Sequence, residues 1–519
     1  MWGKKKVDGF WKVEVKNLQH NHEPSSDMSG HPSCRRFSKE EIQHVREMSK
    51  AGIPPRQILA SLRQGNPNLQ AISRTIYNAK EKIRKENLMG RTAIQALFDE
   101  FVETGFVYDI EHDDKGHLTH LFFAHPFSIM ITKSYSTIFV MDCTYKTNRY
   151  KMPLLEIIGV SSFNTSFYSC FVAMQKEEES DYIWALERFK KLLGVGKNPS
   201  VIVTDRELAL MNAIEIVFPS TTNLLCVWHI EKNILSKCKK YFVEKEAWET
   251  FILSWTNLIK STDEITFFEG WKLLEVDQKV QPLVLNYLEN TWLPFKEKFI
   301  YAWTDKHLHF GNHNSSRAEG AHSMLKTYLQ VSTGDFHEVK QKICLAIEIQ
   351  YQEIKARLES ERLRIPHGFR IPLFQKLISH VSVYALGQIF KQHELASRDG
   401  PLPCCKGHFQ SSMGLPCAHM IREMRTLELV YIHPQWRIDS RSFSCIDGTL
   451  EDEDAQIRPL LNKVEGKYQG MSLSQKEDTR RKLSQLINGS SSLIHEPKVS
   501  SHKGRPTNSK KKKRQLYKA

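Results

Sequence analysis

Residues 137–142 read TIFVMD, and this stretch decides the fold because an apolar, β-branched run ends in an aspartate. Such a run is typical of a strand buried in a sheet, with a carboxylate at or near its C-terminal end. Residues 201–205, VIVTD, repeat the construction. Two central strands of this kind can place Asp142 and Asp205 on one divalent cation, and hard oxygen ligands suit Mg²⁺ or Mn²⁺. The alternative is that each aspartate caps the helix or turn that follows it.

The pattern around these two strands predicts an α/β fold. We expect strands over 137–142, 153–162, 167–174, 200–205 and 222–228, and helices over 181–193 and 207–217. Three strands in a meander, followed by strands that alternate with helices, is the order of a ribonuclease-H-like core. In that fold the first and fourth strands are central neighbours. Asp142 and Asp205 should therefore lie close together.

A third acid follows a long helical region. Residues 230–310 carry helical patterns rich in Trp, Phe and Leu, which predict an all-helical insertion into the core. Residues 311–322, GNHNSSRAEGAH, then lead into an apolar helix. Glu319 falls in the first turns of this helix, from which it can reach the end of the sheet and supply a third carboxylate.

Four segments stand out by their order along the chain: DCTYKTNRYKMPLL at 142–155, TDRELALMNAI at 204–214, CVWH at 226–229 and NSSRAEGAHSMLK at 314–326. Together they resemble the transposase of Mutator-like elements (MULE) and the related far-red-impaired proteins of plants, over roughly residues 10–440. The resemblance implies a catalytic triad of Asp142, Asp205 and Glu319 that binds Mg²⁺ or Mn²⁺ and cleaves and joins DNA strands at transposon ends.

The resemblance also identifies Cys226 and His229 as the C-x-x-H motif that this family carries close to its active site. The motif would order the site or contact DNA. Packing at the end of a strand is the alternative explanation.

The first 90 residues predict small DNA-binding modules. Residues 10–24 alternate like a strand and end in His20 and His22, which resembles the last strand of a WRKY-like or FLYWCH-like zinc finger within residues 1–30. Exposed loop histidines are the alternative. Residues 37–90 open with a capping box, Ser38-x-x-Glu41, and read as three short helices with a basic third one. That pattern is typical of a helix-turn-helix DNA reader, and a solvated charged face explains it equally well.

The core, residues 91–335, is followed by a helical region at 336–395, with helices expected over 336–363 and 371–391. A module at 396–440 contains Cys417-x-His419 after a Gly-Leu-Pro turn, which resembles a SWIM zinc finger. The first half departs from that family's C-x-C pattern because Cys404 and Cys405 are adjacent. One of these cysteines, together with His408, can complete four zinc ligands. Buried free thiols are the alternative.

Basic residues gather at the C-terminal end. Residues 446–519 are predicted to be a mostly disordered tail, with a serine-rich linker over 488–501. Gly-Arg-Pro at 504–506 resembles an AT-hook, whose arginine enters a narrow A·T minor groove, and the lysine run reads as a nuclear localisation signal. A solubilising tail is the alternative. The residues predicted to contact DNA are Arg505, Lys510, Lys511, Lys512, Lys513 and Arg514.

The composition agrees with a nucleic-acid partner. The 519 residues are 40% hydrophobic and 25% charged, which is ordinary for globular units, but the formal charge is +14. No apolar run approaches the roughly 20 residues that span a bilayer, and the first residues do not resemble a signal peptide. Ten scattered cysteines favour reduced thiols with a metal site in a cytosolic or nuclear protein over a disulfide framework.

We therefore predict a nuclear MULE-type transposase that acts on double-stranded DNA, both transposon terminal repeats and target DNA, with Mg²⁺ or Mn²⁺ in the core and Zn²⁺ in the finger. A homodimer is compatible with this prediction. The rival is a DNA-binding transcription regulator descended from a transposase, which has kept the fold and lost catalysis. A third interpretation, a ribonuclease-H relative that acts on RNA, requires a fourth acid close to Asp142, and none is identified from the sequence.

Overall fold

The computed structural model describes residues 2–5, 10–14, 23, 27–277, 280–313, 316–329, 333–364, 366–441, 443 and short segments between 465 and 499. The chain consists of two compact units, Met1–Gly90 and Arg91–Ala519. None of the described helices combines the length and the apolar character needed to cross a membrane. The predicted ligands His20 and His22 and the basic tail at 502–519 lie outside the described residues.

The first unit contains three helices, α1 (Lys39–Lys50), α2 (Pro55–Gly65) and α3 (Ser73–Leu88), and a two-stranded antiparallel ribbon of β1 (Trp2–Lys5) and β2 (Trp11–Glu14). The predicted capping box is confirmed, because Ser38 Oγ accepts from the Glu41 backbone N–H and Glu41 accepts from that of Ser38. Val45, Ile58 and Ile76 are fully buried where the helices meet.

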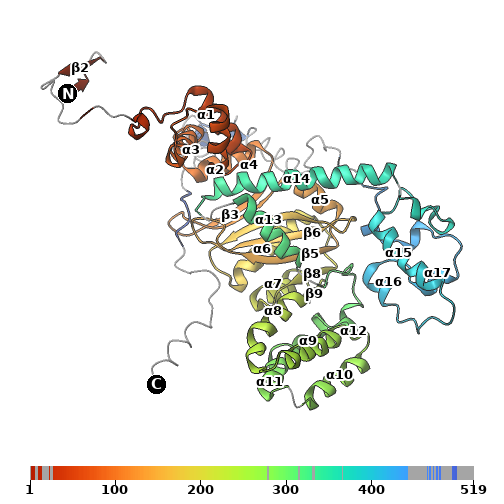
Figure 1. The fold of residues 1–519 in the computed structure, drawn as a ribbon. Coiled ribbons are helices and arrows are strands. Elements are labelled where there is room, and N and C mark those ends of the chain that lie inside the picture. Colours follow the sequence, from red (N-terminus) through yellow and green to blue (C-terminus); the bar gives the residue numbers. More distant parts are fainter. Residues whose placement is uncertain are drawn as a thin grey trace, which may run out of the picture. The chain divides into compact units, whose positions relative to one another are not determined.

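The second unit is built on a seven-stranded mixed sheet in the order β3-β4-β7-β6-β5-β8-β9 (Figure 1). Its strands are β3 (Val107–His112), β4 (Leu118–Ala124), β5 (Ile138–Thr144), β6 (Leu154–Val160), β7 (Ser166–Met174), β8 (Val201–Thr204) and β9 (Thr222–Leu225). β8 pairs in parallel with both β5 and β9, and the other pairs are antiparallel. The prediction that the first and fourth strands are neighbours is confirmed.

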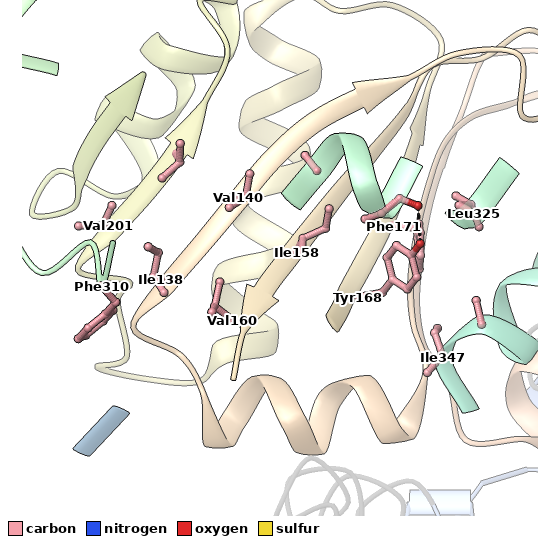
Figure 2. Packing of buried hydrophobic residues seen from close by; sticks show 14 of the residues in the cluster. Ile138, Val140, Ile158, Val160, Tyr168, Phe171, Val201, Phe310, Leu325 and Ile347 are labelled. Carbon is pink, nitrogen blue, oxygen red and sulfur yellow. Dashed lines mark hydrogen bonds between the residues drawn. The ribbon is translucent and has the colours of Figure 1, made fainter. Parts of the chain in front are cut away.

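Helices cover both faces of this sheet because its central strands are apolar on both sides. Phe139 and Met141 of β5 pack against α6 (Glu179–Leu193) and α7 (Leu208–Val217). Ile138 and Val140 point to the opposite face, which α13 (Ser316–Leu329) and α14 (Phe336–Leu363) cover (Figure 2). Asp142 follows the alternation of Ile138 and Val140, so it belongs to the α13 face.

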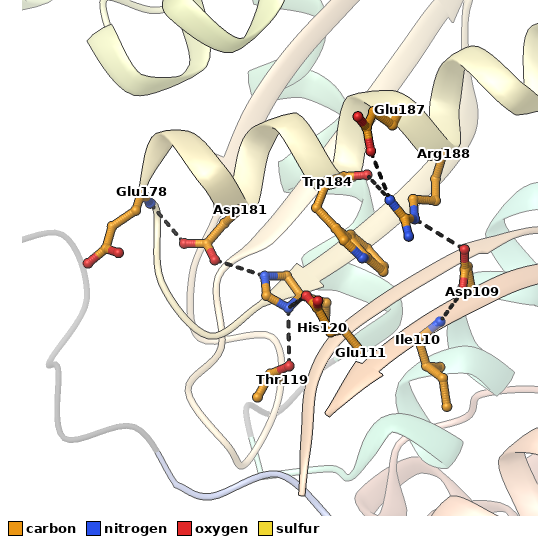
Figure 3. A network of polar contacts seen from close by, with 10 residues as sticks. All are labelled: Asp109, Ile110, Glu111, Thr119, His120, Glu178, Asp181, Trp184, Glu187 and Arg188. Carbon is orange, nitrogen blue, oxygen red and sulfur yellow. Dashed lines mark hydrogen bonds and ion pairs between the residues drawn. The ribbon is translucent and has the colours of Figure 1, made fainter. Parts of the chain in front are cut away.

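Polar contacts fasten α6 to the far edge of the sheet (Figure 3). His120 of β4 lies between two carboxylates, with Nε2 2.8 Å from Asp181 Oδ1 and Nδ1 3.0 Å from Glu111 Oε2. Arg188 Nε donates to Asp109 Oδ2 at 3.1 Å, and its guanidinium stacks on the Trp184 ring. These contacts fix α6 on one face of the sheet, and Asp142 lies on the opposite face.

The predicted all-helical insertion is present. Its helices are α8 (Val227–Cys238), α9 (Lys245–Ile259), α10 (Glu264–Val276), α11 (Pro282–Thr291) and α12 (Tyr301–Thr304), with a core of its own around the fully buried Trp255 and Trp292. α4 (Ala93–Glu103) and α5 (Pro126–Ser134) precede the central strands.

Two predictions for the C-terminal part are wrong in detail. The helix expected over 371–391 does not form before α15 (Val383–Ala396), because Pro372 opens a short 3₁₀ turn, Ser379 has φ +65°, and Ser382 caps the new helix. Residues 494–499, assigned to a linker, lie instead along the start of β4, where His495 N–H donates to Gly116 O and Leu118 N–H donates to His495 O.

Candidate metal centre

Asp142 and Asp205 stand at the same level on neighbouring strands. The parallel register of β5 and β8 ends at the pair Met141 and Thr204, and each aspartate is the next residue. The predicted end of the first strand is wrong, because β5 continues to Thr144 through its pairing with β6. Asp142 is therefore a residue of the strand interior, 8% exposed, and Asp205 directly follows β8.

The helix α13 carries Glu319 in its first turn, as predicted. Ala318, Ala321 and Leu325 bury one side of this helix against the sheet. Tyr168 of β7 donates from Oη to the Ala321 carbonyl at 2.7 Å (Figure 2). The same helix is therefore fixed by packing and by a buried hydrogen bond close to Glu319.

A second contact fixes the start of α13. Arg317 donates from Nη1 to the Asn164 carbonyl in the turn between β6 and β7, at 2.8 Å. Burial lowers the pKa of this guanidinium. The contact ties the residues around Glu319 to the sheet.

Asp142, His229 and Glu319 meet above the sheet, and one ligand atom from each lies within 4.8 Å of the others. His229 Nε2 is 3.5 Å from Glu319 Oε1 and 3.8 Å from Asp142 Oδ2. Asp205 is not in this group of three, but its negative charge acts on His229. The structure thus brings two of the three predicted acids directly together and places the third on the adjoining strand.

The C-x-x-H motif lies where β9 passes into α8, and Cys226 packs in the core at the end of the strand, as the alternative considered from the sequence has it. β9 stops at Leu225, and Cys226 is the N-cap of α8, with its Sγ accepting from the His229 N–H at 3.4 Å. This cap fixes the first turn of α8, from which the His229 ring contacts Glu319 and Asp142. Burial lowers the pKa of His229, while the charges of Asp205 and Glu319 act in the opposite direction.

Two further residues of the centre were missed from the sequence. Glu156 of β6 lies directly opposite Asp142 of β5 and is fully buried. His322, one turn after Glu319 on α13, has Nδ1 3.8 Å from Asp142 Oδ2 and Nε2 3.7 Å from Glu156 Oε2. A single glutamate inside the apolar run LLEIIGV was the only available signal, and it becomes informative once the register of β5 and β6 is known.

The donor set fits a hard divalent cation. Carboxylate oxygens with one or two imidazoles suit Mn²⁺, and carboxylates alone suit Mg²⁺. The side chain of Glu319 is 39% exposed, whereas that of Asp142 is 11% exposed, so the group opens to solvent on the α13 side. Asp142, Asp205 and Glu319, with His229 beside them, are the residues that would hold such an ion.

The predicted finger brings together Cys405, Cys417 and His419. The two sulfurs are 3.9 Å apart, and His419 Nε2 lies 2.7 Å from the Pro403 carbonyl. Cys404 is exposed and is not in this group. The structure therefore distinguishes the adjacent cysteines, which the sequence did not, and it offers three of the four ligands that a structural zinc site uses.

The Gly-Leu-Pro turn is set by tight packing behind these ligands. Gly414 has φ +62°, and a Cβ there would lie 2.5 Å from the Cβ of His433, so only glycine fits. Trp436 donates from Nε1 to the Met413 carbonyl at 2.6 Å. Lys406 forms an ion pair with Asp263, which joins this module to the helical insertion.

A third group, Asp305, His309 and His313, also has ligand atoms within 4.8 Å of one another. Here hydrogen bonds explain the arrangement. The Gly311 N–H donates to His309 Nδ1 at 3.0 Å, so the ring proton is on Nε2, which donates to Asp305 Oδ1 at 3.1 Å. These hydrogen bonds account for the positions of the side chains, and we assign this group to folding the loop before α13.

Comparison with known proteins finds a matching family model. The family model of the MULE transposase domain matches residues 138–233, which run from β5 into α8 and include Asp142, Asp205 and His229. Glu319 lies beyond the matched residues.

Three curated relatives extend the match. The chain is 25% identical over 86% of its length to a region of the PKS-NRPS hybrid synthetase cheA of Chaetomium globosum, which covers 10% of that protein. It is also 25% identical to FAR1-related sequence 5 of Arabidopsis thaliana. That match covers 49% of this chain and 33% of the plant protein. Its identity to far-red impaired response 1 of the same plant is 23%. That match covers 63% of this chain and 40% of the plant protein.

The chain thus spans less than half the length of each of these three relatives. The family model and the two plant relatives point to the same families as the four segments described from the sequence. The chain is a MULE- and FAR1-related protein with a MULE transposase domain at residues 138–233.

Proposed function

We propose that this protein is a DDE-type transposase, which cleaves and joins DNA strands at transposon ends. The observation that carries the proposal is the convergence of Asp142 and Glu319 on His229, with Asp205 on the next strand. These residues come from β5, α13, α8 and the end of β8, four places far apart in the sequence. Folding alone does not require acids to gather in this way, because like charges at close range destabilise each other.

Divalent cations bound there would activate the attacking water or DNA 3′-hydroxyl and stabilise the leaving oxygen of the phosphodiester. The chain's own contribution is to hold the carboxylates in place and to attract the phosphate backbone. Lys326 on α13 and Lys232 on α8 act electrostatically on His322 and His229, so positive side chains stand next to the acids. Such charges favour the approach of a polyanion.

We further propose that residues 91–335 adopt a ribonuclease-H-like core with the insertion at about 230–310. The support is the strand order, with β5 between β6 and β8, and the position of the acids on β5 and after β8. The helices α1–α3 would read DNA, since Arg74, Lys82 and Lys85 are exposed on α3. The basic tail and its Arg505 would add phosphate and minor-groove contacts in the nucleus.

The second candidate is a DNA-binding regulator that has lost catalysis. The names of the plant relatives refer to a far-red response and not to transposition, which favours it. Both candidates predict DNA binding, and only the first predicts cleavage. The third interpretation, action on RNA, required a fourth acid near Asp142, and Glu156 meets that requirement. An RNA–DNA hybrid therefore belongs among the substrates tested.

Strand cleavage distinguishes these candidates. The substrates are duplex DNA carrying the sequences that flank the coding region, an unrelated duplex and an RNA–DNA hybrid, each with Mg²⁺ or Mn²⁺. Cleavage of the flanking sequences by the natural chain and not by Glu319→Gln supports the transposase. Binding without cleavage supports the regulator, and preferential cleavage of the hybrid supports the RNA-acting enzyme.

A further inference from the structure

The centre contains a carboxylate that the DDE assignment leaves without a role. Glu156 has no solvent exposure, and neither of its oxygens has a hydrogen-bond partner among the described residues. A buried polar group without a hydrogen bond destabilises the folded chain, and the cost is larger when the group is charged. An arrangement of this cost calls for a ligand that offsets it.

We propose that Glu156 is a fourth carboxylate of the centre and that, with His322 and beside Asp142, it binds a second divalent cation. The inference rests on the proposed function and deepens it. It adds two ligands to the triad and assigns the centre two cations, one toward Glu319 and one toward Glu156.

The register of the sheet places Glu156 in the centre. Residues directly opposite each other on antiparallel strands project to the same face, and Asp142 pairs with Glu156. Leu154 and Ile158, the neighbours of Glu156 on that face, pack in the cluster under α13. The carboxylate therefore points to the helix that carries Glu319 and His322, and away from α6 and α7.

The distances favour cations over hydrogen bonds. The contacts of His229 with Glu319 and Asp142, and of His322 with Asp142 and Glu156, measure 3.5, 3.8, 3.8 and 3.7 Å. All four are too long for a good hydrogen bond, whose donor and acceptor lie within about 3.2 Å. Two ligands on one cation, each at about 2.1 Å, stand at most about 4.2 Å apart. The four contacts fall between these limits.

His322 provides the second unpartnered atom. Its Nε2, which faces Glu156, is buried and has no hydrogen bond within the described chain, and the residue is 6% exposed. A cation between His322 Nε2 and the Glu156 carboxylate would give both of these unpartnered groups a ligand.

The test is Mn²⁺ binding to the zinc-loaded full chain, counted by electron paramagnetic resonance and followed by thermal unfolding with and without Mn²⁺. The natural chain should bind two Mn²⁺ with high affinity. Glu156→Gln should bind one, or bind the second at least tenfold more weakly. Without Mn²⁺, Glu156→Gln should unfold at the same or a higher temperature, because it removes a buried acid next to Asp142. A residue with a merely structural role would not combine lost cation binding with retained stability.

Glu361→Gln is the matched control. Glu361 of α14 is also buried, at 8% exposure, but its oxygens accept from Arg357 Nε and the Val383 N–H. This variant should be less stable and should still bind two Mn²⁺. If Glu156→Gln does not fold, Glu156→Asp decides: it keeps the charge and shortens the reach, so its second Mn²⁺ should bind at least tenfold more weakly.

The outcomes separate the two proposals. Two Mn²⁺ in Glu156→Gln at the natural affinity, or unchanged binding in Glu156→Asp, would overturn the role of Glu156. A single Mn²⁺ in the natural chain that Glu319→Gln abolishes would also overturn it and leave the transposase centre standing. No Mn²⁺ bound to the natural chain would overturn both.

Discussion

Glu319 Oε1 lies 3.5 Å from Nε2 of His229, although the whole helical insertion separates these residues in the sequence. The insertion leaves the sheet through α8, whose first turn carries His229, and the chain returns through α13, whose first turn carries Glu319. The two junctions of the insertion thus meet over Asp142. This closure explains how a long helical segment can interrupt the core without dividing the group of residues around Asp142.

The charge of Asp205 should be required for cleavage and dispensable for DNA binding. Asp205→Asn keeps the shape of the side chain and removes one negative charge, so cation-dependent cleavage should be lost while DNA affinity stays the same or rises slightly. Gel-shift and cleavage assays on the same duplex measure both properties. A parallel loss of binding and cleavage would show that Asp205 supports the fold instead.

The hydrogen bond from Tyr168 should stabilise the position of α13. Tyr168→Phe leaves the buried Ala321 carbonyl without this donor, which should lower the free energy of unfolding by about 1–2 kcal/mol. Urea denaturation gives the value. Tyr431→Phe removes a hydroxyl from a residue that is 39% exposed, and it should change the free energy by less than about 0.5 kcal/mol. Equal effects of the two variants would contradict the role of Tyr168.

Glu100 should make the stability of the second unit depend on pH in the acid range. Burial alone would raise the pKa of Glu100, but the hydrogen bond and charge of His337 and the charge of Lys340 lower it to about 2. A lowered pKa means that the stabilisation is present above the unfolded value of about 4.5 and is lost as the pH falls toward 2.

The comparison variant is Glu100→Gln. The natural chain should be more stable than this variant by about 2–3 kcal/mol at pH 7, and the difference should shrink steadily between pH 4.5 and 2. Denaturant titrations at several pH values give the difference directly. A difference that does not change over this range would show that the contacts of Glu100 with α14 are weak.

Substitution of some cysteines of the finger should release its zinc, and substitution of others should not. Cys417→Ser or His419→Ala should release one zinc per chain and loosen residues 400–437, because metal binding there is also folding energy. Cys405→Ser should behave likewise, while Cys404→Ser should keep its zinc, since only Cys405 lies near Cys417. Zinc analysis of protein purified without chelators measures this. Absence of zinc from the natural chain would contradict the predicted zinc site.

The tail should contribute affinity for DNA without sequence choice. Residues 502–519 hold eight basic residues and no acid. If about five of them neutralise phosphates, removal of the tail should reduce the slope of log affinity against log salt by about 4–5. Arg505→Ala should instead erase a modest preference for A·T-rich duplex. A salt titration on element-end, A·T-rich and G·C-rich duplexes tests both; an unchanged slope would leave the tail a role in import or solubility.

The sheet could be predicted because each strand is marked by residues that follow one another in the sequence. Each central strand is a continuous apolar run, and the order of runs and helices restricts the topology to a few arrangements. The end of β5 could not be predicted in the same way. TIFVMD looks complete at Asp142, but β6 continues the pairing to Thr144, and only the partner strand shows this. The helix expected over 371–391 failed for a related reason, since apolar periodicity does not register the left-handed backbone of Ser379.

The centre could be predicted only where a motif marks it. Asp142, Asp205 and Glu319 stand in segments that resemble a known family, so they could be named in advance. Glu156 stands in a strand with no motif for it, and a lone glutamate there looks like an edge position. Its partnership with Asp142 exists only across the strand pair. His322 requires the orientation of α13 as well, since it reaches the acids because it lies one turn after Glu319.

The measurement that tests the central claim most directly is the anomalous diffraction of crystals grown with Mn²⁺. The proposed function predicts an anomalous peak about 2.1 Å from a carboxylate oxygen of Asp142 and another of Glu319, with Asp205 close enough to ligate the same ion. In Asp142→Asn crystals that peak should weaken or vanish. A map of the natural chain with no anomalous density among these three acids, under conditions that load Mn²⁺ elsewhere on the protein, would contradict the assignment of a catalytic metal centre.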